Sequence, residues 1–152
     1  MYFARRAPIV LDCGKIELTK KGSAMNVWER NGNHEVRTAD QLNAILLNRH
    51  RVDSASVNSF WLSHASRFPC MSIMVTDELA TVWYAPKEGH AGYVSSTTID
   101  TLEKGGVTLF DLDGQRQEVG NHMIVKWPEA VQAAREFLES SGLPHSIQWL
   151  EL

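Results

Sequence analysis

Long apolar runs, a cysteine framework and an excess of basic charge are all missing from this sequence of 152 residues. No stretch approaches the roughly 20 apolar residues of a transmembrane helix, which argues against a membrane protein. The two cysteines, Cys13 and Cys70, lie far apart and belong to no C-x-x-C pair. We therefore expect reduced thiols rather than a disulfide framework or a zinc site. Fifteen Lys and Arg against 18 Asp and Glu give a formal charge of −3, which argues against nucleic acid as a direct ligand.

The remaining composition is that of one globular domain, with 43% hydrophobic and 9% aromatic residues. Near the start, Arg5 and Arg6 precede an apolar run that Asp12 interrupts after only five residues. A run of that length is too short for the apolar core of a secretion signal. The sequence therefore predicts a cytoplasmic protein.

Residues 1–24 differ in charge from the rest of the chain. They contain five basic and two acidic residues, whereas residues 25–152 carry a net charge of −6. We interpret 1–24 as a basic arm or as additional edge strands, since residues 9–11 and 16–18 are both strand-like. Met25 could also be an alternative start. The domain proper is expected to span residues 25–152.

The first half of this domain carries a hairpin signal and a helix signal. Asn31-Gly32 is a favoured pair for a two-residue hairpin turn. Thr38 followed by Gln41 forms a capping-box pattern that opens an amphipathic run. The expected elements are strands at 26–30 and 34–38, a helix at about 38–51, and strands at 57–62, 71–75 and 80–84, the last two joined by a tip at 76–79.

The second half begins with an irregular segment at 86–93, where Pro86 and two glycines oppose regular pairing. Loops of this kind often carry recognition. Pro128 and Glu129 mark a helix start, and Gly142 marks its end. The expected elements are strands at 107–110, 115–119 and 123–126, a helix at about 128–141, and a strand at 147–152. The sequence predicts a single α+β domain, mainly an antiparallel β-sheet meander with two main α-helices packed on it.

No motif in the sequence brings together groups for catalysis or metal binding. The six histidines never recur three or four residues apart, as local metal pairs do. The sequence also lacks a G-x-S-x-G elbow, a P-loop and a G-x-G-x-x-G turn. We therefore predict no catalytic residues, no metal and no cofactor. One alternative stays open, in which folding brings Cys70 as a nucleophile to His64 or His90 as its base.

Negative charge gathers between residues 77 and 118, where eight acidic and three basic residues give a net −5. Trp83 and Tyr84 lie in the same stretch, and adjacent strand residues point to opposite faces of a sheet. Aromatic anchors within an acidic surface suit a basic protein partner. We predict partner contacts from five carboxylates in turns and loops and from two rings nearer the centre of the interface: Asp77, Glu78, Glu88, Asp111 and Asp113, with His90 and Tyr93.

The last 85 or so residues carry an ordered series that matches a known family. The series is Pro69-x-Met71-x-Ile73-x-Val75, Ala80-x-Val82-x-Tyr84, Pro86, Gly92-Tyr93-x-Ser95, Asn121, Ala130, Ala133-Ala134-Arg135-Glu136-Phe137, Gly142-Leu143-Pro144 and Ile147-x-Trp149-x-Glu151-Leu152. In order and spacing it resembles the first-numbered family of bacterial polymorphic-toxin immunity proteins. Two positions depart from the family pattern: Trp127 stands where a small polar helix cap is common, and Trp83 stands where a histidine is common.

The resemblance implies a small α+β protein encoded beside a secreted toxin, commonly a cytosine-deaminase-like effector. Such a protein neutralises the toxin inside the cell by stoichiometric occlusion. The implied partner is a basic toxin domain in a 1:1 complex, without cofactor, nucleic acid or membrane. Trp149 and Glu151 belong to the pattern, and Trp149 is expected in the core. Two alternatives stay open: an acidic α+β adaptor that neutralises nothing, and the Cys70/His hydrolase.

Overall fold

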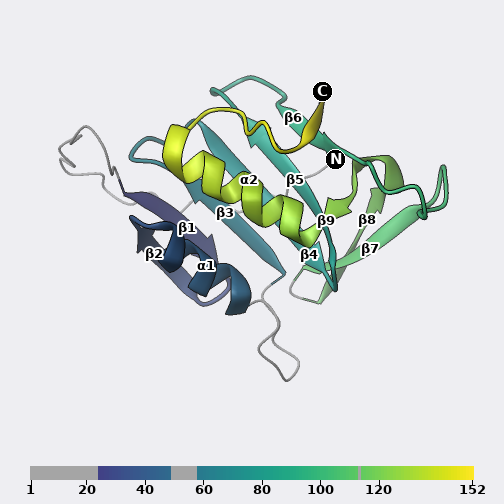
Figure 1. Ribbon diagram of the computed structural model, residues 1–152, viewed down its shortest axis with the longest axis horizontal. Helices are drawn as coiled ribbons and strands as arrows, with labels where there is room; N and C mark the ends of the chain where they lie inside the picture. The colour runs from purple at the N-terminus through teal and green to yellow at the C-terminus, as the bar shows by residue number, and fades with distance from the viewer. Residues whose placement is uncertain (1–23, 49–57, 113) are drawn as a thin grey trace.

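An antiparallel sheet forms the centre of the computed structural model, and both helices lie on one of its faces (Figure 1). The structure describes residues 24–48, 58–112 and 114–152. In chain order the elements are β1 (Met25–Glu29), β2 (Gly32–Val36), α1 (Ala39–Leu47), β3 (Ser59–Ser63), β4 (Cys70–Thr76), β5 (Leu79–Ala85), β6 (Tyr93–Ser96), β7 (Val107–Leu112), β8 (Gln115–Gly120), the short 3-10 helix η2 (Asn121–Met123), β9 (Val125–Lys126), α2 (Trp127–Ser140) and β10 (Gln148–Glu151).

The strand order confirms the predicted antiparallel α+β fold and refines the meander. The sheet runs β10-β6-β5-β4-β3-β1-β2, and β9 pairs with the start of β5. The sequence pattern missed the strand β6, which starts at Tyr93, the last residue of the segment 86–93, directly after Gly92. The hairpin β7–β8 forms at the predicted place but makes a separate two-stranded sheet. The predicted arm 1–24 lies outside the described residues except for Ala24.

The first hairpin turns one residue earlier than the Asn31-Gly32 pair indicates. Glu29 pairs with Gly32, so Arg30 and Asn31 make the turn. Gly32 has a φ of 137°, which glycine adopts readily. This register places Met25 and Val27 in the core, and a slip by one residue would turn both to the opposite face. Burial of these two side chains therefore decides the register.

Helix α1 begins with the predicted capping box. Thr38 Oγ1 accepts the backbone N–H of Gln41 at 3.2 Å, and Gln41 Oε1 accepts the N–H of Thr38 at 3.3 Å. Together they satisfy two of the N–H groups that a helix start leaves open. The helix runs from Ala39 to Leu47, and its predicted continuation to 51 falls outside the described residues.

Helix α2 begins one residue before the predicted start, at Trp127, so this residue is the first of the helix and not its cap. Trp127 is buried and stacks with Phe60 at a ring-centroid distance of 6.2 Å. The cap position is Lys126, whose N–H donates to Glu129 Oε2 at 2.9 Å. The helix ends at Ser140, and its C-cap is Ser141, with a left-handed φ of 58°, in place of the expected Gly142.

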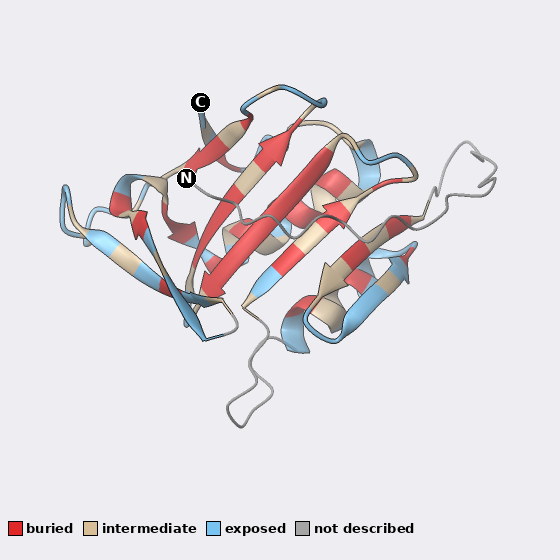
Figure 2. Cartoon of the chain, turned by 180° about the vertical axis from the view of Figure 1, so that it is seen from behind, coloured by how far each residue is buried: buried red, intermediate tan, exposed pale blue. Residues whose placement is uncertain are grey.

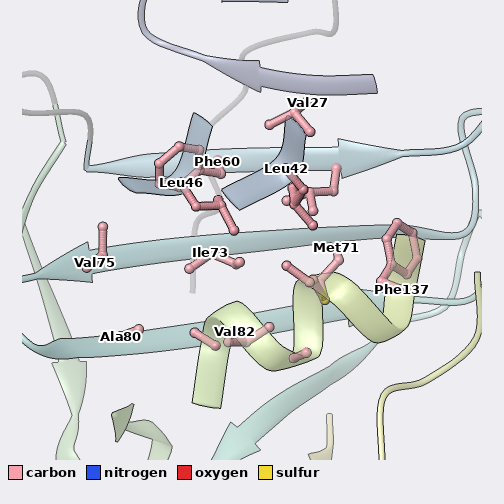
Figure 3. Packing of buried hydrophobic residues seen from close by; sticks show 14 of the residues in the cluster. Val27, Leu42, Leu46, Phe60, Met71, Ile73, Val75, Ala80, Val82 and Phe137 are labelled. Atoms are coloured by element: carbon pink, nitrogen blue, oxygen red, sulfur yellow. The ribbon is translucent and has the colours of Figure 1, made fainter. Parts of the chain in front are cut away.

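The main core lies between the two helices and the sheet (Figure 3). Burying a Leu or Phe side chain fully stabilises the fold by about 1.5–3 kcal/mol, so these contacts dominate its stability. Strand alternation supplies one side of the core, since every second residue of β4 and β5 faces the helices. The core residues labelled in Figure 3 are Val27, Leu42, Leu46, Phe60, Met71, Ile73, Val75, Ala80, Val82 and Phe137.

The opposite face of the sheet is covered at one end by the β7–β8 hairpin. Met74 packs there with Phe110 and Val119 in a second core cluster, so β4 is buried along almost its whole length (Figure 2). Trp83 also lies on this face, tilted against Trp61 at 5.8 Å between ring centroids. Tyr84 points to the helix face and is 6% exposed. The predicted division of this aromatic pair between the two faces is confirmed.

Candidate functional site

The candidate partner-binding residues lie at two opposite ends of β5. Asp77 and Glu78 form the turn that precedes the strand, and Glu88 and His90 lie in the loop that follows it. The strand has seven residues, so these two ends are separated by about 20 Å. The candidates therefore form two sites rather than one patch.

At the first end, the β4–β5 turn lies beside the start of α2. The backbone N–H of Trp127 donates to the carbonyl of Glu78 at 2.8 Å. Both turn residues are exposed, and Asp77 has a positive φ of 47°, which aspartate tolerates better than most residues. Asp77 thus shapes the turn as well as carrying charge.

Asp111 belongs to the same end, because its hairpin packs against β4. Leu79, next to the β4–β5 turn, and Leu112, next to the β7–β8 turn, both contact the second core cluster, which brings these two turns together. Asp111 Oδ1 accepts the N–H of Gly114 at 2.7 Å, a common way for aspartate to stabilise a turn. Asp113 lies outside the described residues.

At the second end, hydrogen bonds shape the loop between β5 and β6. The indole of Trp83 donates to the carbonyl of Ala91 at 3.0 Å, and Gly92 N–H donates to His90 Nδ1 at 2.8 Å. The N–H of Leu152 donates to the carbonyl of Gly92 at 3.0 Å, which ties the loop to the strand β10 (Figure 1). Glu88 is exposed on this loop. These hydrogen bonds give the loop a defined conformation.

The imidazole of His90 stacks on Tyr93, with ring centroids 5.3 Å apart and an interplanar angle of 22°. Because Nδ1 accepts the Gly92 N–H, the proton of the neutral ring lies on Nε2. Nε2 points to Glu151 Oε1 at 3.7 Å. The Nδ1 lone pair is thus used by the hydrogen bond from Gly92 and Nε2 carries the proton, so the neutral ring has no free lone pair with which to act as a base.

Glu151 lies beside the candidate residues His90 and Tyr93, and the sequence-based selection did not include it. It lies in β10, opposite Tyr93 in the register, although 58 positions separate the two in the chain. One signal pointed to it beforehand, its place in the family pattern. Trp149, which was expected in the core, is partly buried and packs against the main core without belonging to it, and its indole N–H donates to Pro144 O at 2.7 Å.

The relationship of the chain to known proteins follows from its match to a family model. The model described as immunity protein Imm1 matches residues 30–151. The chain belongs to the Imm1 family. No curated protein matches it.

Membership of the Imm1 family agrees with the resemblance in the sequence and implies a cognate toxin as partner. Several residues that carried this resemblance meet at the second end of β5, beside the loop between β5 and β6. Gly92, Tyr93 and Glu151 are joined there by the contacts of His90 and by the pairing of β6 with β10. Side chains far apart in the chain thus make one surface of the Imm1 domain.

Cys70 is poorly suited to be the nucleophile of the alternative hydrolase. The thiol is fully buried, and burial raises its pKa from 9.0 to about 12. His64 uses Nε2 to contact the carbonyl of Phe137 at 2.8 Å. In the described part of this Imm1 chain, no hydrogen bond joins Cys70 to a histidine. A thiol with so high a pKa supplies almost no thiolate near neutral pH.

Within residues 24–48, 58–112 and 114–152, no three His, Cys, Asp or Glu side chains gather as a possible metal site. None of the helices in those same ranges is long and apolar enough to cross a membrane.

Proposed function

We propose that this Imm1 protein binds a cognate toxin domain in a 1:1 complex and neutralises it by occlusion. The observation that carries the proposal is the family match over residues 30–151. The toxin is a deaminase-type effector that acts on nucleic acid, and the encounter takes place in the cytoplasm. Inhibition of this kind needs no catalytic residue and no cofactor in the immunity protein.

The charge of the chain supports this choice of partner. An enzyme that acts on nucleic acid carries a basic cleft to hold phosphates. The net charge of −5 between residues 77 and 118 favours rapid encounter with such a cleft and disfavours nucleic acid itself as a ligand. The proposed contacts are Asp77, Glu78 and Asp111 near the start of β5, Asp113, which follows Asp111 by two positions in the sequence, and Glu88, His90 and Tyr93 near the end of β5.

Co-expression with the toxin domain encoded next to this protein tests the proposal. We expect cell survival and recovery of a stable complex containing one copy of each chain. Death of the cells together with failure to co-purify would contradict it. A stable complex without rescue would instead favour the acidic adaptor.

An alanine scan of the seven residues then maps the contacts, and Glu139→Ala serves as the matched control because Glu139 is an exposed carboxylate on α2. We expect several of the seven variants to bind the toxin at least about tenfold more weakly. Unchanged affinity in all seven would contradict the proposed interface while leaving the inhibition intact.

A further inference from the structure

The carboxylate of Glu151 is exposed beside a stacked pair of rings. Its side chain is 66% exposed, and Oε1 lies 3.7 Å from His90 Nε2, which is too long for a hydrogen bond of ordinary strength. An ionised carboxylate offers about four acceptor positions. The contact with His90 therefore leaves most of the acceptor capacity of Glu151 directed to solvent.

The imidazole beside this carboxylate is held in a fixed orientation. Gly92 N–H binds Nδ1 at 2.8 Å and Tyr93 stacks on one ring face. The His90 side chain is still 23% exposed. The loop that carries it is anchored to Trp83 and Leu152. A partner therefore meets a preformed surface and loses little free energy in ordering it.

We propose that Glu151, His90 and Tyr93 form a receptor for an arginine side chain of the cognate toxin. The guanidinium lies over the outer face of the His90 ring and donates two hydrogen bonds to the Glu151 carboxylate. This assignment rests on the proposed function for the identity of the partner, and it adds a specificity-determining residue, Glu151, to the interface.

The chemistry favours arginine over lysine. A guanidinium is flat, stacks on rings and matches the two oxygens of a carboxylate, whereas an ammonium is a strongly hydrated point charge. Glu88, exposed on the same loop, offsets the neighbouring charge of Lys87. Arginine and tyrosine are also among the residues that contribute most to protein interfaces.

The first experiment measures the affinity of the toxin domain for Glu151→Gln by calorimetry. Glutamine keeps the shape of the side chain and removes the charge, so we expect at least about tenfold weaker binding. Glu139→Gln, an exposed carboxylate on α2, is expected to bind like the wild type. Equal affinity of Glu151→Gln and the wild type would overturn the receptor and leave the proposed function standing.

A second experiment needs no toxin. Wild-type protein is titrated with argininamide and separately with citrullinamide, which has the same shape without the charge, while the Gly92 amide and Trp83 indole signals are followed by NMR. We expect saturable shifts with argininamide only, and their loss in Glu151→Gln. The same response to both ligands, or no response, would overturn the receptor. A wild type that responds to argininamide but does not bind the toxin would contradict the proposed function instead.

Discussion

Gly92 lies so close to Trp83 that a Cβ at position 92 would come 2.6 Å from the indole Nε1. The same Cβ would come 2.7 Å from the carbonyl oxygen of Tyr84, which is backbone and cannot move aside alone. Gly92 also has a positive φ of 100°, a region that glycine alone enters at low cost. The conformation of the loop between β5 and β6 therefore depends on one residue without a side chain.

We predict that Gly92→Ala destabilises the fold by about 3 kcal/mol, through strain and overpacking together. Gly89→Ala is the matched control, because Gly89 has a φ of 79° but nothing within 4 Å of a Cβ. It should cost only about 1 kcal/mol, from strain alone. Urea unfolding of both variants measures the difference, and equal losses would contradict the close contact.

The Cys70 thiol should react slowly in the native protein. Cys13→Ser leaves Cys70 as the single thiol. In that variant we expect Ellman's reagent at about pH 8 to modify the native protein at least about 100-fold more slowly than the protein in urea, because burial hinders both ionisation and access. A native reaction rate close to the rate in urea would support the alternative hydrolase, in which Cys70 is the nucleophile.

The same thiol makes stability depend on pH in the alkaline range. Folding raises the pKa of Cys70 from 9.0 to about 12, so the folded state keeps a proton that the unfolded state releases. Stability should therefore be constant below about pH 9, fall as the pH rises toward 12, and then level off. The pKa of Tyr84 is raised too, from 10.0, chiefly by burial, which adds a fall beginning about one unit higher.

Urea unfolding at intervals from pH 8 to 10 isolates the Cys70 contribution. The decline between about pH 9 and 10 should be smaller in Cys70→Ala than in the wild type, since alanine has no proton to lose. An equal decline in the two proteins would assign the effect to other groups.

Ser141→Gly should stabilise the protein by about 0.5–1 kcal/mol. Ser141 ends α2 with a left-handed φ of 58°, and glycine is the residue that takes this conformation with least strain. Its carbonyl, which accepts the Tyr84 hydroxyl at 3.4 Å, is unchanged by the substitution.

Ser140→Gly supplies the control of opposite sign. Ser140 is the last residue of α2, and its hydroxyl donates to the carbonyl of Glu136 at 3.0 Å. Glycine there removes this bond and weakens the helix by about 0.5–1 kcal/mol. The midpoints of thermal unfolding should therefore move in opposite directions, and a shift of the same sign in both variants would contradict the role of Ser141.

Features governed by neighbours in the chain could be predicted from the sequence. The Thr38–Gln41 capping box forms as expected, because its two hydrogen bonds join residues three positions apart. Strand alternation places Trp83 and Tyr84 on opposite faces. The family match over residues 30–151 agrees with the resemblance that the ordered series between Pro69 and Leu152 carries. The capping box and the strand alternation depend on local geometry alone.

The tertiary structure decided the features that depend on distant contacts. It divided the acidic candidates between two ends of β5, set β7–β8 apart as a second sheet, and brought Glu151 to His90. None of these could be read from spacing, because the register between β6 and β10 is set by packing and pairing of strands more than 50 residues apart. The sequence alone thus determined most of the elements, the charge and the family, whereas burial and strand register determined which side chains meet.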